Sequence, residues 1–486
     1  MSDRRKRMTS DALILLVGAS AGKGIAQIYM VISARSLGAE SFAALALGIS
    51  IAQILADGIL FHNGNVIVRA ASAETSSAAL IRWGAVSNRR GLLLGCVVLV
   101  SGCAVAFTAP GSWTIGVLAS AAFLPLAGLR IASAALLASG SNRQRIVYSD
   151  LLAPVCILFF LPACYFAFNA FGFGVAYCVG SLVAFLVMCR NLAFGERLSP
   201  EEDARINESF SSSGGLRSFA RSTYAISNLN NLTRWGDTLL VGVLLGVSDT
   251  AVYAAVAVIP LVVDTFTVRV AALSAAEGAR VADRVGRSQL GALFAESSSA
   301  ALAMAVPMCA VIVAAASPIL VILYGDSFEV GAPILRVLIL AGLVRASFSG
   351  DSPVLLSADG HRHELGNSLF SALVTLSLSV VGAVGFGLMG FVIGRLIGEF
   401  ISRYARYLVV ERLIGVRIGI MKSNLIAYAE VVVIGVGGAR AGESATGSPV
   451  VAACVSAVTV LALLAVVDRR RYQFLWGVIM QARPGK

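Results

Sequence analysis

The chain has 486 residues, of which 57% are hydrophobic and only 13% are charged. A soluble protein of this length would expose large apolar patches to water, so the composition excludes that class and is typical of a polytopic helical membrane protein. The net charge of +11 comes from residues between apolar segments, which favours contact with an anionic membrane leaflet, and no nucleic-acid partner is expected.

Apolar segments recur from end to end and predict an all-α polytopic membrane protein with about fourteen transmembrane helices. The first apolar segment follows the basic stretch MSDRRKRM and is too long for a cleaved signal peptide, so we expect it to remain as a helix. The predicted spans are residues 11–34, 41–62, 91–109, 112–138, 147–168, 170–193, 218–246, 249–275, 298–324, 331–357, 365–386, 388–410, 420–438 and 448–467.

The distribution of Lys and Arg predicts the orientation. Counted from a cytoplasmic N-terminus, the inner segments take nearly all basic residues, Arg403 and Arg406 among them, and the outer loops take only Arg35 and Arg440. This asymmetry would disappear if one span in mid-chain were missed or added. We therefore expect both termini in the cytoplasm.

Two inner loops have some length. Ala70–Arg90 is predicted to form a short amphipathic interfacial helix, and Gly195–Gly215 is a polar linker. The outer loops are short and leave no room for a folded catalytic domain, so we do not expect an enzyme. The predicted organisation is an N-lobe at 1–193, a cytoplasmic linker at 194–216, a C-lobe at 217–412, and helices thirteen and fourteen with a basic tail at 413–486.

The two predicted lobes resemble each other. Leu37–Ala46 and Leu245–Ala254 share a Leu-Gly pair after the first helix of each lobe, and Ala135–Arg143 and Val354–Arg362 share Leu-Leu and a later Gly and Arg after the fourth. These matches favour a parallel six-helix repeat, which recurs among transporters.

Ionisable residues inside the predicted spans are the strongest functional signal, because each costs about 3 kcal/mol at the bilayer centre unless it meets a partner or a wet cavity. The basic ones are Lys23, Arg130, Arg221, Arg234, Arg269, Arg336, Arg345 and Arg395; the acidic ones are Asp57, Asp237, Asp264, Asp351, Glu399 and Glu430.

Some of these charges have a partner within their own helix. Arg395 and Glu399 are spaced i,i+4 and are predicted to form a structural ion pair, and Arg234 and Asp237, spaced i,i+3, allow a similar pair. Arg221 and Arg336 lie near span ends, where the side chain can extend to the interface.

The remaining cations have no such partner. Lys23 lies between Gly18, Gly22 and Gly24, in a stretch that permits close helix approach, and suits an anion or a carboxylate such as Asp57. If the cations of both lobes converge, they form a cavity for a phosphate or diphosphate headgroup. The predicted headgroup-binding residues are Lys23, Arg130, Arg234, Arg269 and Arg345; the predicted coupling or orienting acids are Asp57, Asp237, Asp264 and Asp351. The alternative is that every charge belongs to a structural ion pair.

The eight Cys and three His show no CxxC pair and no metal-ligand spacing. We expect neither a metal nor another cofactor.

Three stretches resemble bacterial flippases of lipid-linked polysaccharide units, a family of the multidrug/oligosaccharidyl-lipid/polysaccharide exporter superfamily. They are ARSLGAESFAALALGISIAQILADG (Ala34–Gly58), WGDTLLVGVLLGVSDTAVYAAVAVI (Trp235–Ile259), and LYGDSFEVGAPILRVLILAGLVRA (Leu323–Ala346) with LLSADGHR (Leu355–Arg362).

The resemblance implies two six-helix lobes around a central cavity in the bacterial inner membrane. It also implies alternating access that moves undecaprenyl-diphosphate-linked oligosaccharides from the cytoplasmic to the periplasmic leaflet, with coupling to H⁺ or Na⁺ left open. Glycan polymerases and glycosyltransferases would be its partners, besides membrane lipid. Related flippases often carry Arg where this chain has Lys23, which puts bidentate phosphate binding by this residue in doubt.

Other functions stay open at this stage. A cation-coupled multidrug extruder and a peptidoglycan-precursor flippase share the superfamily. A membrane polymerase or ligase of lipid-linked glycans would need a sizeable outer loop, and a scaffold for glycosyltransferases would not need charges within the membrane.

Overall fold

The computed structural model describes residues 3–61, 64, 66–67, 77–108, 111–139, 141–193, 214–264, 287–351, 361–415, 419–443 and 448–467. Within these residues the chain is helical and has no strand. Eight helical stretches of the described residues are long and apolar enough to cross a membrane. The chain is therefore a multi-pass membrane protein.

The contacts between Cα atoms divide the chain into two compact units. We call residues 13–251 the N-unit, and residues 1–12 with 252–486 the C-unit. The N-unit holds most of α1 (Asp3–Gly58), α3 (Ser77–Ser87), α4 (Arg89–Thr108), α5 (Gly111–Ser120), α6 (Phe123–Ala138), α7 (Asn142–Arg145), the π-helical η1 (Ile146–Leu151), α8 (Leu152–Phe168), the 3-10 turn η2 (Asn169–Phe171), α9 (Gly172–Ala193), α11 (Gly214–Leu245) and the start of α12 (Val247–Ala257).

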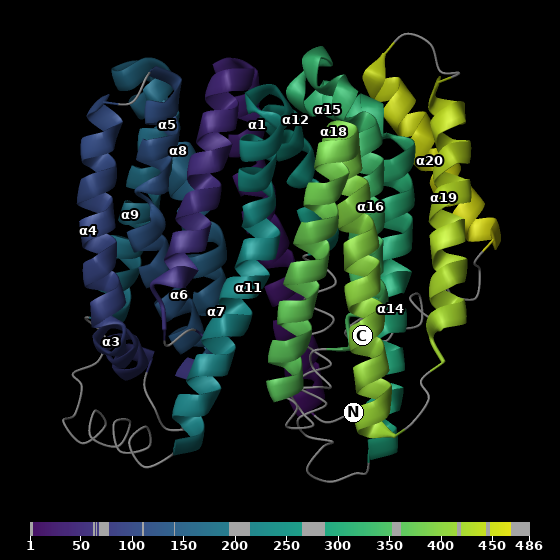
Figure 1. The fold of residues 1–486 in the computed structure, drawn as a ribbon, viewed down its shortest axis with the longest axis horizontal. Coiled ribbons are helices and arrows are strands. Elements are labelled where there is room, and N and C mark those ends of the chain that lie inside the picture. Colours follow the sequence, from purple (N-terminus) through teal and green to yellow (C-terminus); the bar gives the residue numbers. More distant parts are fainter. Residues whose placement is uncertain are drawn as a thin grey trace. The chain divides into compact units, whose positions relative to one another are not determined.

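The C-unit contains the rest of α12 and the later helices. Its most extensive contacts join α14 to α19 and α19 to α20, which lie side by side in Figure 1. The helices are α14 (Arg287–Ala314), α15 (Ala316–Tyr324), the 3-10 helix η3 (Asp326–Gly331), α16 (Ala332–Ser347), α18 (His361–Ile414), α19 (Met421–Glu443) and α20 (Pro449–Val467).

Within the described residues the predicted spans fall on these helices, and two pairs of spans are continuous. The parts of the predicted spans at 265–275 and 352–357 lie outside the described residues. Spans one and two form α1 with a break at Gly38, and spans eleven and twelve form α18 with a break at Phe386 and Gly387. The count of fourteen membrane crossings stays a prediction.

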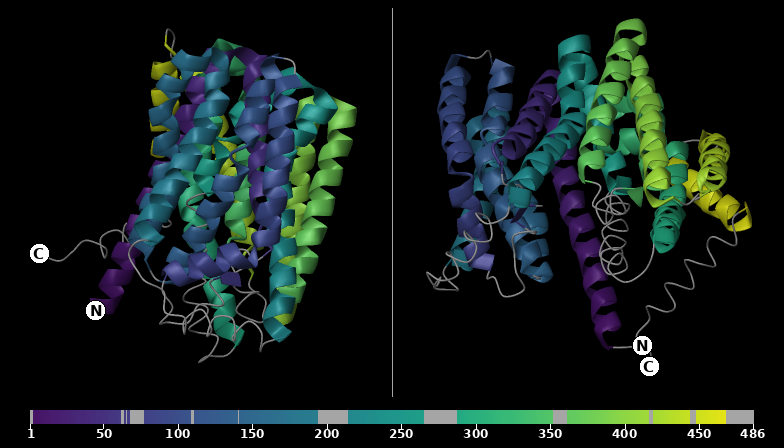
Figure 2. Two further views of the ribbon diagram at one scale, coloured as in Figure 1. Left: turned by 90° about the vertical axis from the view of Figure 1, so that its left-hand side faces the viewer. Right: turned by 60° about the horizontal axis from the view of Figure 1, so that its bottom comes forward.

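The predicted interfacial helix is present in part as α3, which packs on α6 and α4. It lies across the ends of these helices instead of along them (Figures 1 and 2), as an interfacial helix should. Most of the predicted linker at 194–216 and the basic tail lie outside the described residues.

The N-unit extends beyond the predicted N-lobe, because α11 groups with the earlier helices. Ala220 of α11 packs in the apolar cluster of this unit, and polar contacts also join α11 to α1. The Tyr224 hydroxyl donates to the Gly58 carbonyl at 2.7 Å, and Asn231 donates to the Gln53 carbonyl at 3.3 Å.

The first pair of repeated segments shares a backbone feature. Gly38 and Gly246, the glycines of the two aligned Leu-Gly pairs, have φ of 72° and 91°. This left-handed conformation suits glycine because a side chain there would be strained. The glycines of the second aligned pair, at 140 and 360, lie outside the described residues.

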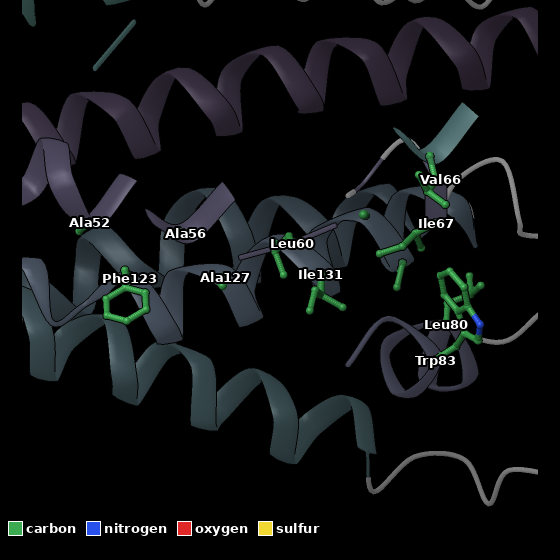
Figure 3. Packing of buried hydrophobic residues seen from close by; sticks show 13 residues of the cluster. Ala52, Ala56, Leu60, Val66, Ile67, Leu80, Trp83, Phe123, Ala127 and Ile131 are labelled. Carbon is green, nitrogen blue, oxygen red and sulfur yellow. The ribbon is translucent and has the colours of Figure 1, made fainter. Parts of the chain in front are cut away.

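Each unit has its own apolar core. In the N-unit, Ala52 and Ala56 of α1 meet Phe123 and Ala127 of α6, and Trp83 of α3 closes one end of the cluster (Figure 3). The C-unit core gathers around Phe294 of α14, Phe348 directly after α16, and Tyr407 of α18. These cores fix the helices that carry the charged residues described next.

Candidate functional site

The N-unit contains a cluster of polar side chains at membrane depth. Arg130 of α6 forms an ion pair with Asp57 of α1. Its Nη2 donates to Gln53 Oε1 at 2.5 Å and its Nη1 to the Gln53 carbonyl at 3.2 Å. The side chains of Arg130 and Asp57 are 28% and 25% exposed, so the pair is accessible.

Two further helices complete this cluster. Asn231 of α11 donates to Asp57 Oδ2, and Gln53 Nε2 donates to the Tyr177 hydroxyl of α9 at 3.2 Å. We call Gln53, Asp57, Arg130, Tyr177 and Asn231 the N-cluster. The carboxylate of Asp57 accepts from both a guanidinium and an amide, so it joins α1 to α6 and α11.

The C-unit holds a longer network. Arg345 of α16 forms two hydrogen bonds with Asp264. Its Nε donates to Oδ1 at 3.0 Å and its Nη2 donates to Oδ2 at 3.2 Å. Arg345 Nη1 lies 3.9 Å from Glu399 of α18, and Glu399 also pairs with Arg403 at 3.0 Å. Arg403 Nη1 then reaches Asp351 at 3.1 Å.

The network continues to a more enclosed end. Arg406 contacts Asp351 at 3.5 Å and Glu364 at 3.4 Å. Asp351 is 2% exposed, whereas Arg345 and Asp264 are 19% and 16% exposed. The C-cluster is an alternating chain of acids and arginines, which are Asp264, Arg345, Glu399, Arg403, Asp351, Arg406 and Glu364.

The predicted binding residues fall into different surroundings. Arg130 and Arg345 each pair with a carboxylate from another helix. Lys23 is half-buried on α1, Arg234 is exposed on α11, and Arg269 lies outside the described residues.

The predicted coupling acids also differ. Asp57 belongs to the N-cluster, and Asp264 and Asp351 belong to the C-cluster. Asp237 is buried, with 1% of its surface exposed. The predicted convergence of all these residues on one cavity stays a prediction.

Glu399 has ion pairs other than the predicted one. They join it to Arg403, one turn further along α18, and to Arg345 of α16. Arg395 Nη1 donates to the Tyr253 hydroxyl at 3.2 Å. The predicted ion pair of Arg395 with Glu399 stays a prediction.

The sequence did not single out Arg403 and Arg406 as site residues, and both lie within α18 and join the C-cluster. It also passed over Gln53 and Asn231, because uncharged polar residues in an apolar segment are weak signals. For Arg403, the i,i+4 spacing from Glu399 was the signal in the sequence that could have identified it.

No group of three or more metal-ligating side chains occurs among the described residues. No family model matches the chain, and no curated protein matches it.

Solved structures do match. The lipid II flippase MurJ, in an inward closed conformation, aligns with a TM-score of 0.67 at 10% identity, covering 94% of this chain and 99% of that one. A MATE transporter in complex with MaD5 aligns with a TM-score of 0.63 at 16% identity, covering 83% and 96%. An inward-facing multidrug resistance MATE transporter of the MOP superfamily aligns with a TM-score of 0.54 at 15% identity, covering 83% and 98%. At these identities the likeness shows the fold, which this chain shares with MurJ and the MATE transporters of the MOP superfamily.

Proposed function

We propose that the chain is a flippase of this fold. It moves undecaprenyl-diphosphate-linked oligosaccharide units from the cytoplasmic to the periplasmic leaflet of the bacterial inner membrane by alternating access, with both termini in the cytoplasm. The observation that carries the proposal is the accessible Arg130 guanidinium of the N-cluster, which lies within an apolar helix and is 28% exposed.

Arg130 suits a diphosphate for geometric reasons. Its planar guanidinium already forms a forked contact, to Gln53 with one terminal nitrogen and to Asp57 with the other. Diphosphate oxygens match the same fork and carry more charge than one carboxylate. In the proposed cycle the headgroup replaces Asp57 as the partner of Arg130.

Exchange of partners at Arg130 also offers a way to couple flipping to the movement of a proton. With Arg130 turned to the headgroup, Asp57 keeps the amide of Asn231 and loses the charge of Arg130, and in the proposed cycle it then takes up a proton. A proton on Asp57 would then travel with each loaded state. Lys23, Arg234, Arg269 and Arg345 remain the further proposed contacts of the headgroup, and Asp237, Asp264 and Asp351 the further proposed coupling or orienting acids.

The comparisons favour a lipid-linked cargo. The MurJ structure, named as a lipid II flippase, spans 94% of this chain, whereas the MATE structures span 83%. A chain that extends beyond the region shared with MATE transporters suits a cargo with a long lipid tail. Helices α19 and α20 are proposed to lie outside the six-plus-six repeat.

A cation-coupled multidrug extruder is the second proposal. Its support is the MATE likeness and the C-cluster, in which four carboxylates surround three arginines. An acidic site of this kind attracts cationic drugs and inorganic cations.

The test uses purified full-length protein in liposomes that contain a fluorescent undecaprenyl-diphosphate oligosaccharide. We expect protein-dependent exposure of the label to an impermeant quencher, and a loss of about tenfold or more in rate for Arg130→Ala. Arg221→Ala removes an exposed arginine of α11 and serves as the control. Unchanged flipping in Arg130→Ala, or transport of a cationic dye in place of the lipid, would overturn the proposal.

A further inference from the structure

The C-unit contains a cavity of about 670 Å³, where the ends of α14 and α19 meet η3 and the first turns of α15, α16 and α20. None of its lining residues belongs to the C-cluster. This volume is within the range of small-molecule sites. Small side chains make up most of its wall, and three ionisable residues join them. The lining residues are Ala314, Ser317, Pro318, Val321, Asp326, Glu329, Ala332, Arg336, Ala439, Gly442, Ser448, Pro449, Ala452 and Ser456.

Arg336 supplies the cation of this cavity. Its side chain is half-buried one turn into α16, and its Nε donates to the Val313 carbonyl at 3.3 Å. No carboxylate of the described residues forms an ion pair with it. The two terminal nitrogens of the guanidinium are thus left for an acceptor within the cavity, and a phosphate group is the acceptor that fits the fork best.

Two carboxylates supply negative charge to the same cavity. Asp326 and Glu329 belong to η3 and are exposed at the cavity. The Ser317 hydroxyl donates to Glu329 Oε1 at 2.5 Å and fixes that carboxylate against α15. One cation and two carboxylates disfavour a diphosphate, but they complement a ligand that carries both a phosphate and an ammonium group.

The cavity adjoins an apolar surface. Ala439 lines it, and Val436 and Val433, one and two turns earlier on α19, are 47% and 70% exposed. Such a surface suits acyl chains. The sequence predicts that this end of the helices faces the periplasm, at the depth of lipid phosphates.

We propose that this cavity binds the headgroup of a phospholipid with a primary ammonium, of the phosphatidylethanolamine class, from the outer leaflet. Arg336 holds the phosphate, and Asp326 and Glu329 hold the ammonium. The bound lipid joins the pair α19 and α20 to α15 and α16, which form the other wall. This binding is independent of the cargo proposed above.

The test measures lipids bound to the purified full chain by native mass spectrometry, after exchange into detergent with equal amounts of phosphatidylethanolamine, phosphatidylcholine and phosphatidylglycerol. We expect phosphatidylethanolamine to be retained in preference to the other two. Arg336→Gln should weaken its retention by about tenfold or more, because a charge-assisted contact is lost. Arg440→Gln, which alters an exposed arginine of α19 outside the cavity lining, should leave it unchanged.

The double variant Asp326→Asn/Glu329→Gln probes the ammonium side without touching Arg336, so the proposal stays testable if Arg336→Gln does not fold. It should abolish the preference for phosphatidylethanolamine over phosphatidylglycerol. Equal retention of all three lipids by the unaltered protein, or an unchanged preference in either variant, would refute the proposal. Because no transport is measured, such a failure leaves the flippase proposal untouched.

Discussion

Arg345 and Asp264 form a two-point ion pair between α16 and the segment after α12, with both contacts at or below 3.2 Å. Both side chains are mostly buried, at 19% and 16% exposure. The paired geometry satisfies two charges that would each be costly alone in an apolar helix. It also ties Arg345 to the rest of the C-cluster through Glu399.

The first prediction concerns this pair. Arg345→Ala leaves Asp264 buried without its partner, so we expect a loss of about 3–5 kcal/mol in stability, seen as a lower thermal midpoint in detergent. The double variant Arg345→Ala/Asp264→Ala should recover part of the loss, because it leaves no unpaired charge at this point. Arg440→Ala, at an exposed position, is the control. A double variant less stable than Arg345→Ala would show that the loss of stability does not come from leaving Asp264 unpaired.

The second prediction concerns Asp351, which is 2% exposed and accepts from both Arg403 and Arg406. Asp351→Asn leaves the buried Arg406 and the half-buried Arg403 competing for the remaining acids, and should cost about 3–5 kcal/mol. Glu296→Gln, on the exposed face of α14, removes a carboxylate without this effect. Equal thermal midpoints for the two variants would contradict the role of Asp351 as the link between the arginines.

Hydropathy identified the charged residues that lie within apolar segments, because this is a local property of the sequence. It did not predict their partners. Asp57 was a possible partner of Lys23, and the sequence did not predict its ion pair with Arg130 of α6. Periodicity places a residue on a helix face but does not say which helix packs against that face. The same limit applies to Glu399 of α18, because its spacing within the helix does not predict the ion pair with Arg345 of α16.

The fold was easier to predict than the site. Apolar length and turn glycines such as Gly38 and Gly246 are local properties, and the described parts of the expected spans are helical. The contribution of Gln53 and Asn231 depends on the packing of α1 against α11, which no local pattern of either helix encodes.

The third prediction contrasts two basic residues of the N-unit. Arg130 contacts Asp57 and Gln53 with separate nitrogens, so Arg130→Lys keeps the charge but loses the fork, and flipping in liposomes should fall by about tenfold. Lys23→Arg should keep flipping activity if only charge matters at that position. Loss of flipping in Lys23→Arg together with full activity of Arg130→Lys would reverse the assigned roles.

The last prediction uses two glycines of α1 that are two residues apart. A Cβ on Gly22 would overlap the backbone carbonyl of Asp150 in the π-helical turn η1, whereas a Cβ on Gly24 would meet no atom within 4 Å. Gly22→Ala must separate two backbones and should cost about 1–3 kcal/mol. Gly24→Ala should stabilise the helix by about 0.5–1 kcal/mol, because alanine loses less backbone entropy. Thermal midpoints that shift in opposite directions would confirm the close approach of α1 and η1, since helix propensity alone would make both substitutions stabilising.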